Sequence, residues 1–240
     1  MIKEILFTVR NPKVIKGEKK GYQTFILHLA PEKSAGSGNI CPWASPGCVA
    51  ACLNTAGRGG IFKKGESTNT IQEARKRKTR MFMNDRREFL TLLESEIRRA
   101  VKKAERKGLI PVFRLNGTSD LKWENFDIIQ KFPEVQFYDY TKSIDRILDA
   151  DLPYNYHLTF SRSELNDALA ERALRVGRNV AVVFHGGLPD TWRGFRVVNG
   201  DESDLRFLDD RGVVVGLKAK GRGKKDESGF VVEAAELVTA

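Results

Sequence analysis

The stretch VQFYDYTKSIDRILDADLPYNYHLTFSRSELNDALAERALRVGRNVAVVFHGG, residues 135–187, alternates short apolar runs with short helical patterns. The runs VQFYDYT, YHLTFS and NVAVVFHGG are rich in β-branched and aromatic residues, whereas SIDRILDA and SELNDALAERALRVG repeat apolar residues at helical spacing. Strands separated by helices in this way are typical of a parallel sheet that is buried on both faces. The stretch therefore predicts βαβ units and an α/β fold.

The same alternation continues outward on both sides. Upstream, the apolar run LIPVFRLNG at residues 109–117 precedes the helical pattern NFDIIQKF at 125–132. Downstream, FRVVNGD, SDLRFLDD and GVVVGLKAKG lie between residues 195 and 221. We expect a TIM-like parallel (β/α) barrel, complete or partly open, and an open doubly wound sheet is the alternative.

The N-terminal part predicts further strands and the clearest helix. EILFTVR (4–10) and YQTFILHLA (22–30) have strand patterns, and NPKVIKGEKKG between them is expected to be a loop or a hairpin-like connection. Residues 85–108 form a helical pattern with Asp85 as the expected N-cap and Gly108 as the expected end. We expect one domain over residues 1–240, with an N-terminal strand or hairpin at 1–20 and a cysteine-bearing loop at 36–66.

The composition limits the classes of protein. The 240 residues carry a formal charge of +10, with basic blocks at 75–80, 98–107 and 218–225. Positive charge attracts polyanions such as nucleic acid, although solvated helix faces produce the same pattern. The chain has no apolar run near the roughly 18 residues of a membrane span, and MIKEILFTVRNPK is not a signal-peptide pattern. These features predict a cytoplasmic protein without a membrane partner.

Polar and ionisable residues stand where the predicted strands end. Because the loops after parallel strands converge at one rim, these side chains are expected to lie together. Arg114 and Lys218 are expected to orient an anionic ligand by charge-assisted hydrogen bonds. The cofactor-binding candidates are Arg114, Asn116, Asp120 and Lys218, and the catalytic candidates are Asp139, Lys142 and His185. Asp139 or His185 is a candidate for proton transfer.

All three cysteines of the chain lie in CPWASPGCVAAC, residues 41–52. If CVAACL begins a helical turn, Cys48 and Cys52 share a face, and the turn residues between them and Cys41 bring the third thiol back. A structural zinc site needs a fourth ligand, such as a histidine or an acidic residue from elsewhere. A [4Fe-4S] cluster with three thiolates leaves one iron open. The interpretation as metal ligands therefore leaves both metals open, with iron-sulfur preferred.

Two families resemble this chain. A three-cysteine loop directly after the first strand of a β/α barrel resembles the radical S-adenosylmethionine (SAM) superfamily, although its usual gaps of three and two residues are six and three here. CPWASPGCVAACLNTAGRG, RLNGTSDLKWE, YDYTK, LTFSRSE and NGDESDLRFLDDRGVVVGLKAKG resemble the phage gene product 88 family more closely. The second resemblance implies a phage protein in the host cytoplasm with an iron-sulfur cluster on the three cysteines. It implies no reaction.

Three functional hypotheses follow. The first is a phage-type iron-sulfur protein whose open iron faces the barrel rim, with a radical SAM-like enzyme as one form. The second is a zinc-stabilised nucleic-acid-binding protein that uses the basic blocks. The third is a metal-dependent hydrolase built on Asp201, Asp204, Asp209 and Asp210, for which an acidic helix start is the simpler interpretation. Whether the protein is an enzyme stays open at this point.

Overall fold

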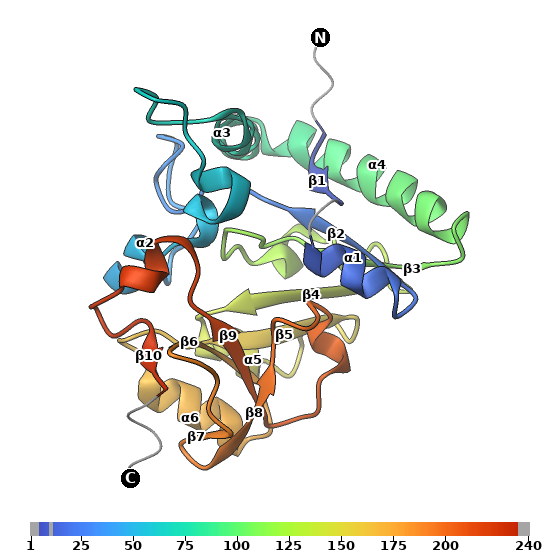
Figure 1. Cartoon of the computed structure of the whole chain (residues 1–240). Coiled ribbons are helices and arrows are strands. Elements are labelled where there is room, and N and C mark those ends of the chain that lie inside the picture. The colour runs from blue at the N-terminus through green and yellow to red at the C-terminus, as the bar shows by residue number, and fades with distance from the viewer. Residues whose placement is uncertain (1–4, 10–11, 235–240) are drawn as a thin grey trace.

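The computed structural model of this chain describes residues 5–9 and 12–234, and a ten-stranded sheet runs through it (Figure 1). The long strands are mutually parallel, which confirms the α/β class. They are β2 (Tyr22–Leu27), β3 (Ile110–Arg114), β4 (Gln136–Thr141), β5 (Tyr156–Ser161), β6 (Val180–His185), β8 (Phe195–Asn199) and β9 (Val214–Lys218).

Three two-residue strands complete the sheet. β1 (Phe7–Thr8) pairs antiparallel with β2, and β7 (Thr191–Trp192) pairs antiparallel with β8. β10 (Val232–Glu233) runs parallel to the end of β6, beside Phe184 and His185. The C-terminal part of the described chain therefore returns to the carboxyl rim.

The strand order is β1-β2-β3-β4-β5-β6-β9-β8-β7. Among the described residues this sheet does not close, so the structure gives a mostly parallel open sheet and a closed barrel is not confirmed. The order also departs from a simple barrel, because β9 lies next to β6 although β8 precedes it in the chain. Between β6 and β8 the chain forms the β7 edge strand rather than the helix that a regular βαβ unit supplies.

The connection between β2 and β3 contains five of the helices in the described chain. The helices of α type are α1 (Pro12–Glu18), α2 (Pro46–Ala50), α3 (Thr70–Asn84), α4 (Arg86–Glu105), α5 (Ile144–Leu148) and α6 (Asp167–Arg175). Those of 3-10 type are η1 (Leu53–Thr55), η2 (Gly57–Gly60), η3 (Trp123–Phe126), η4 (Arg206–Leu208) and η5 (Gly221–Lys225). No helix in the described ranges has the length and apolar character needed to cross a membrane.

Local signals explain which helix predictions are confirmed. Asp85 caps α4 by accepting a hydrogen bond from the Glu88 amide at 3.1 Å, and Gly108 follows the helix with a φ of 67°. The loop expected at 11–21 instead contains α1, which begins at Pro12 as first-turn prolines commonly do. The helix expected at 125–132 is wrong, because η3 ends before Asp127, whose φ is 59°.

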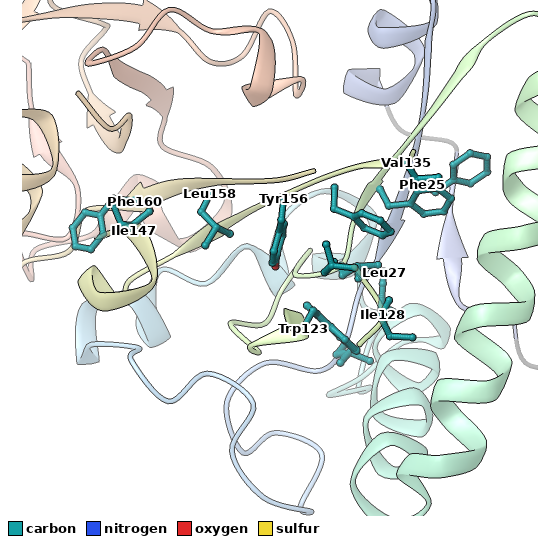
Figure 2. Close-up of a cluster of buried hydrophobic side chains, with 14 of the residues drawn as sticks. Phe25, Leu27, Trp123, Ile128, Val135, Ile147, Tyr156, Leu158 and Phe160 are labelled. Atoms are coloured by element: carbon teal, nitrogen blue, oxygen red, sulfur yellow. The ribbon is translucent and has the colours of Figure 1, made fainter. Parts of the chain in front are cut away.

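The two faces of the sheet have different covers. On one face, Phe25, Leu27 and Trp123 belong to the large core (Figure 2). α4 contributes Phe89 and Ile97 to this core. On the opposite face, Val112 and Tyr138 pack against Leu205 and Phe207 in and beside η4. Side chains alternate along a strand, so Arg114 and Tyr140 lie on this second face near the strand ends. The loop that contains η4 thus covers part of the face on which the site is built.

Candidate metal and ligand site

A cavity of about 220 Å³ lies at the carboxyl ends of the parallel strands. The cysteine-bearing loop, the strand ends and the segment from η5 to β10 form its walls. Eight of the predicted site residues line it: Cys41, Cys48, Cys52, Arg114, Asn116, Asp120, Lys142 and Lys218. Asp139 is fully buried and His185 is exposed beside Glu233, and neither is among the lining residues.

Each cysteine has a different position in the local structure. Cys41 precedes α2, Cys48 lies within it, and Cys52 is the N-cap of η1. Ser45 caps α2, because its hydroxyl oxygen accepts a hydrogen bond from the Cys48 amide at 3.2 Å. The expected helical turn at CVAACL is therefore short and ends before the third cysteine.

A carboxylate distant in the sequence fastens α2 to the rim. Glu164 accepts hydrogen bonds from the Ser45 hydroxyl at 2.8 Å and from the Gly47 amide at 2.7 Å. A Cβ at position 47 would lie 2.8 Å from the Glu164 carboxyl carbon and 2.3 Å from the Ser228 hydroxyl. A side chain at position 47 would therefore displace the Glu164 carboxylate and the Ser228 hydroxyl, and the contact with Glu164 helps to position Cys48.

α3 holds the other half of the cysteine-bearing loop. The Arg75 guanidinium donates to the backbone carbonyl of Asn54 at 3.1 Å and to its side-chain oxygen at 2.7 Å. The Gln72 amide group donates to the Gly59 carbonyl at 2.7 Å. Lys78, from the same basic block, is buried and donates to the Leu6 carbonyl at 3.0 Å. Part of the first basic block is therefore structural.

Two of the sulfur atoms accept backbone hydrogen bonds. Cys41 Sγ accepts from the Glu32 amide at 3.3 Å, and Cys52 Sγ accepts from the Asn54 amide at 3.5 Å. Burial raises the pKa of Cys41 to about 12, and the neighbouring Cys52 and Cys48 also raise it. Burial raises the pKa of Cys52 as well, while Lys142 and Arg75 act in the opposite direction. The free thiols of Cys41 and Cys52 are therefore neutral at pH 7, and a bound metal ion would be needed to deprotonate them.

The donors at the cavity meet the requirements of an iron-sulfur cluster and of zinc to different degrees. Within residues 5–9 and 12–234, no group of three or more His, Cys, Asp or Glu side chains has a metal-holding arrangement, so the three thiols do not converge on one point here. They do share one cavity, and sulfur is the natural ligand of iron-sulfur clusters. None of the chain's three histidines lines it. The chemistry of the donors therefore fits a three-thiolate cluster better than a four-ligand zinc site.

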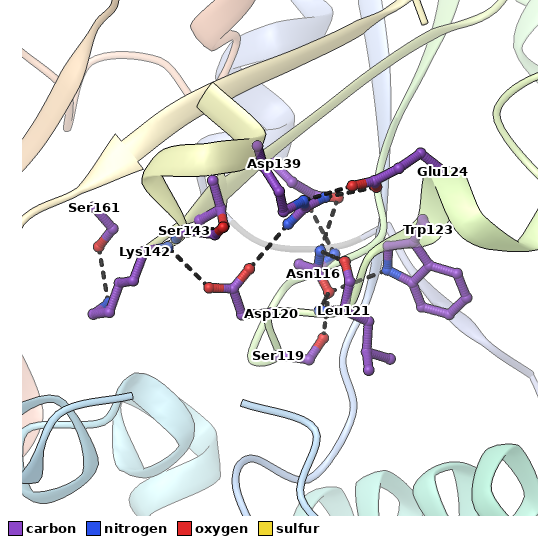
Figure 3. Close-up of polar contacts among 12 residues, drawn as sticks. Asn116, Ser119, Asp120, Leu121, Trp123, Glu124, Asp139, Lys142, Ser143 and Ser161 are labelled. Atoms are coloured by element: carbon purple, nitrogen blue, oxygen red, sulfur yellow. Dashed lines mark hydrogen bonds and ion pairs between the residues drawn. The ribbon is translucent and has the colours of Figure 1, made fainter. Parts of the chain in front are cut away.

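The floor of the cavity is a turn organised by Asn116 (Figure 3). Its side-chain oxygen accepts from the Ser119 hydroxyl at 2.8 Å, the Leu121 amide at 2.9 Å and the Trp123 indole at 3.1 Å. Its backbone amide donates to the Asp139 carboxylate at 2.7 Å. Because these polar atoms of Asn116 form hydrogen bonds within the protein, its role in this structure is to shape the cavity floor.

Asp120 also serves the floor. One of its carboxylate oxygens accepts from the Lys142 amide at 2.9 Å, and the other accepts from Arg146 at 3.1 Å. Arg146 is 2 % exposed and also forms a two-point ion pair with Glu124, at 2.6 and 2.8 Å. The buried guanidinium thus joins two carboxylates from the turn after β3 to α5.

Arg114, one of the two residues expected to orient an anionic ligand, is already paired with a carboxylate. The Arg114 guanidinium lies 3.2 Å from an Asp204 carboxylate oxygen and over the ring of Tyr140, 4.7 Å from its centroid. The same carboxylate accepts from the Tyr138 hydroxyl at 3.0 Å. Arg114 therefore supports the cavity wall through a carboxylate from the η4 loop.

The four acidic residues considered for a hydrolase each face a different cation. Asp201 pairs with Lys220, and Asp204 pairs with Arg114. The partners of Asp209 and Asp210 are Arg206 and Arg196, respectively. Ion pairs with separate cations explain the acidic stretch without a metal ion.

Asp139 is predicted to make stability depend on pH. Burial raises its pKa from the ordinary 3.8 to about 7, although the Asn116 amide and the Tyr156 hydroxyl oppose the shift. The folded state therefore binds a proton more tightly than the unfolded state, and this contribution to stability is complete below about pH 4 and is lost as pH rises through 7. We expect the unfolding free energy of the wild type minus that of Asp139→Asn to decrease between pH 4 and 7.

The difference in unfolding free energy between the wild type and Asp139→Asn is free of the histidines' contribution, which has the opposite pH dependence. Burial lowers the pKa of His28 to about 3 and that of His157 to about 4, so each stabilises the folded state as pH rises toward 6.5. Both proteins contain these histidines, and their effects cancel in the difference. Urea denaturation at several pH values measures it, and a constant difference would exclude the predicted titration.

Some residues that build the site carry no sequence signal. Glu164 bonds a segment 117 residues earlier in the chain, and Phe230 brings an aromatic ring to the Lys142 ammonium, 5.6 Å from its centroid. Arg162 holds this last segment by donating to the carbonyl of Phe230 at 2.9 Å. Neither spacing nor composition predicts such contacts, because each joins segments far apart in the chain.

Comparisons with known proteins gave one match. The model of a family described as Gene product 88 matches residues 5–234, as the quoted motifs predict. No curated protein and no solved structure matches the chain.

Proposed function

For this chain, which belongs to the gene product 88 family, we propose an iron-sulfur protein in which Cys41, Cys48 and Cys52 hold a [4Fe-4S] cluster. One iron would lack a protein ligand and would face the cavity at the carboxyl rim of a partly open β/α barrel. The observation that carries the proposal is that all three thiols line one cavity, formed by a loop that distant segments fasten at several points.

The surroundings of the sulfur atoms support the proposal. Backbone amides at Glu32 and Asn54 donate to two of them, and such bonds stabilise negative charge on sulfur. Arg75 and Lys142 favour the thiolate of Cys52 electrostatically. When bound, a cluster of this kind supplies one-electron transfer and an exchangeable position at its open iron. The chain's part is to balance the charge of the sulfur atoms and to present a ligand to that position.

The alternative, a zinc-stabilised nucleic-acid-binding protein, has less support. The cavity offers no histidine as a fourth zinc ligand, and both carboxylate oxygens of Asp120 already accept hydrogen bonds. The three basic blocks lie on α3, on α4 and at β9 to η5, and Figure 1 shows α4 well separated from α2 and β9. Arg75 and Lys78 donate to carbonyl groups within the protein, which leaves fewer cations of the first block for phosphate contacts.

We predict that protein purified without oxygen contains about four irons and four sulfides per chain and absorbs visible light as a cubane does. The variant in which Cys41, Cys48 and Cys52 are all changed to alanine is expected to lose all of the iron and sulfide. Ser37→Ala alters the same loop outside the cavity lining and should retain them. Metal and sulfide analysis, with a visible spectrum, measures each protein.

Two results would contradict the cluster. Wild-type protein without iron and sulfide, made with ample iron, would exclude it. One zinc per chain, lost in the triple variant, would favour the alternative, and the fourth ligand would then have to come from a rearranged rim.

A further inference from the structure

Positive charges exceed negative charges among the side chains that line the cavity, once the ion pairs are taken into account. Three carboxylates line it, and each already contacts a cation: Asp120 contacts Arg146, Asp201 contacts Lys220, and Asp204 contacts Arg114. The lining also contains Lys142 and Lys218. In the part of the chain that the structure describes, neither ammonium group forms an ion pair. Lys142 and Lys218 therefore have no carboxylate within ion-pair distance among the described residues.

Lys142 is the more constrained of the two. Its side chain is half-buried, and its ammonium donates one hydrogen bond, to the Ser161 hydroxyl at 3.0 Å (Figure 3). An ammonium carries three donors, so two remain for a ligand. The backbone amide of the same residue is fixed by Asp120 at 2.9 Å. Because a partly desolvated, unpaired cation is unfavourable, an anion bound here would remove an existing cost.

The walls around this ammonium are largely apolar. Val183 and Leu217 from β6 and β9 line the cavity together with Phe230, whose ring lies beside the Lys142 ammonium. At about 220 Å³ the space is only moderately larger than the roughly 150 Å³ cavity that accepts benzene in an engineered protein. Only a small ligand fits, and an apolar body suits this wall.

We propose that Lys142, with Ser161 and Lys218, binds the carboxylate or phosphate group of a small organic anion whose apolar body lies against Val183, Leu217 and Phe230. The inference deepens the proposed function and rests on it for the reactive centre, because the anion shares the cavity with the three thiols. It also reassigns anion recognition from Arg114, which Asp204 neutralises, to Lys142.

Calorimetric titration with benzoate and with phenyl phosphate tests the proposal, and the uncharged benzyl alcohol is the comparison probe. We expect wild-type protein to bind at least one of the two anions, and to bind benzyl alcohol at least tenfold more weakly. Lys142→Met should weaken anion binding by about tenfold to a hundredfold, because it removes a charged donor. Lys103→Met removes the same charge from an exposed position on α4 and should bind as wild type does.

The two anions separate a carboxylate site from a phosphate site. Ser161→Ala is the second variant if Lys142→Met does not fold, and it should weaken binding in the same direction. The proposal is overturned if neither anion binds the wild type, or if a folded Lys142→Met or Ser161→Ala protein binds as tightly. The triple cysteine variant separates the anion site from the cluster, because it should still bind the anion although it holds no cluster. Wild-type protein without iron would contradict the proposed function but not the anion site.

Discussion

Replacing Arg146 by methionine is expected to lower the free energy of unfolding by about 3 to 5 kcal/mol, because it leaves the buried Asp120 carboxylate and the largely buried Glu124 carboxylate without their cation. The guanidinium is 2 % exposed and touches Asp120 at 3.1 Å and Glu124 at 2.6 and 2.8 Å. Methionine preserves much of the side-chain volume, so the loss reports the charge. Urea denaturation followed by circular dichroism measures it.

An exposed arginine provides the matched control. Arg175 pairs with Glu171 one helical turn away, and its side chain is 71 % exposed. Arg175→Met should cost only about 0.3 to 0.5 kcal/mol, because solvent screens such pairs. Similar small losses for the two variants would show that the buried network contributes little. Arg146→Lys should fall between them, since an ammonium cannot make the two-point contact with Glu124.

The second large effect is expected at Trp123, which joins the core to the floor of the cavity. The side chain is fully buried in the core (Figure 2). Its ring packs against Phe82, Phe89 and Phe126, with centroid distances of 5.6, 6.5 and 5.8 Å. Trp123→Ala should lower the free energy of unfolding by about 3 to 5 kcal/mol, because it leaves a cavity in a close-packed core. Chemical denaturation monitored by circular dichroism measures the change.

A more conservative variant separates packing from hydrogen bonding. The Trp123 indole donates to the Asn116 side chain at 3.1 Å, and phenylalanine cannot replace that bond. Trp123→Phe should therefore cost clearly less than Trp123→Ala, the lost hydrogen bond accounting for about 1 kcal/mol. Equal losses for the two variants would contradict the assignment of most of the effect to ring packing.

Trp123 and Arg146 both bond to the turn that forms the cavity floor. Asn116 and Asp120 lie at the start and in the middle of one turn. The Trp123 indole donates a hydrogen bond to Asn116, and Arg146 donates one to Asp120. Lys142 follows β4 and is positioned by the same Asp120. A change in the buried network should therefore also move the ammonium that we propose binds the anion, whereas the cysteine-bearing loop is held separately by α3 and Glu164.

Features that depend on local patterns could be predicted from the amino-acid sequence. Apolar runs identified the strands β2 to β6, since each needs only a few consecutive residues, and Asp85 and Gly108 marked the limits of α4. The position of the cysteines directly after a strand, and of Arg114 and Lys142 at strand ends, was enough to bring eight predicted residues to one rim. The reason is that parallel strands carry their ends to the same side of a sheet.

The tertiary structure alone decided how distant segments pair. It placed β9 beside β6, laid η4 on the second face of the sheet, and brought Glu164 to Gly47 and Phe230 to Lys142. It also gave Arg114 a carboxylate partner and left Lys142 without one among the described residues. Such pairings depend on side-chain packing and charge between residues far apart in the chain, and periodicity over a few residues carries no record of them.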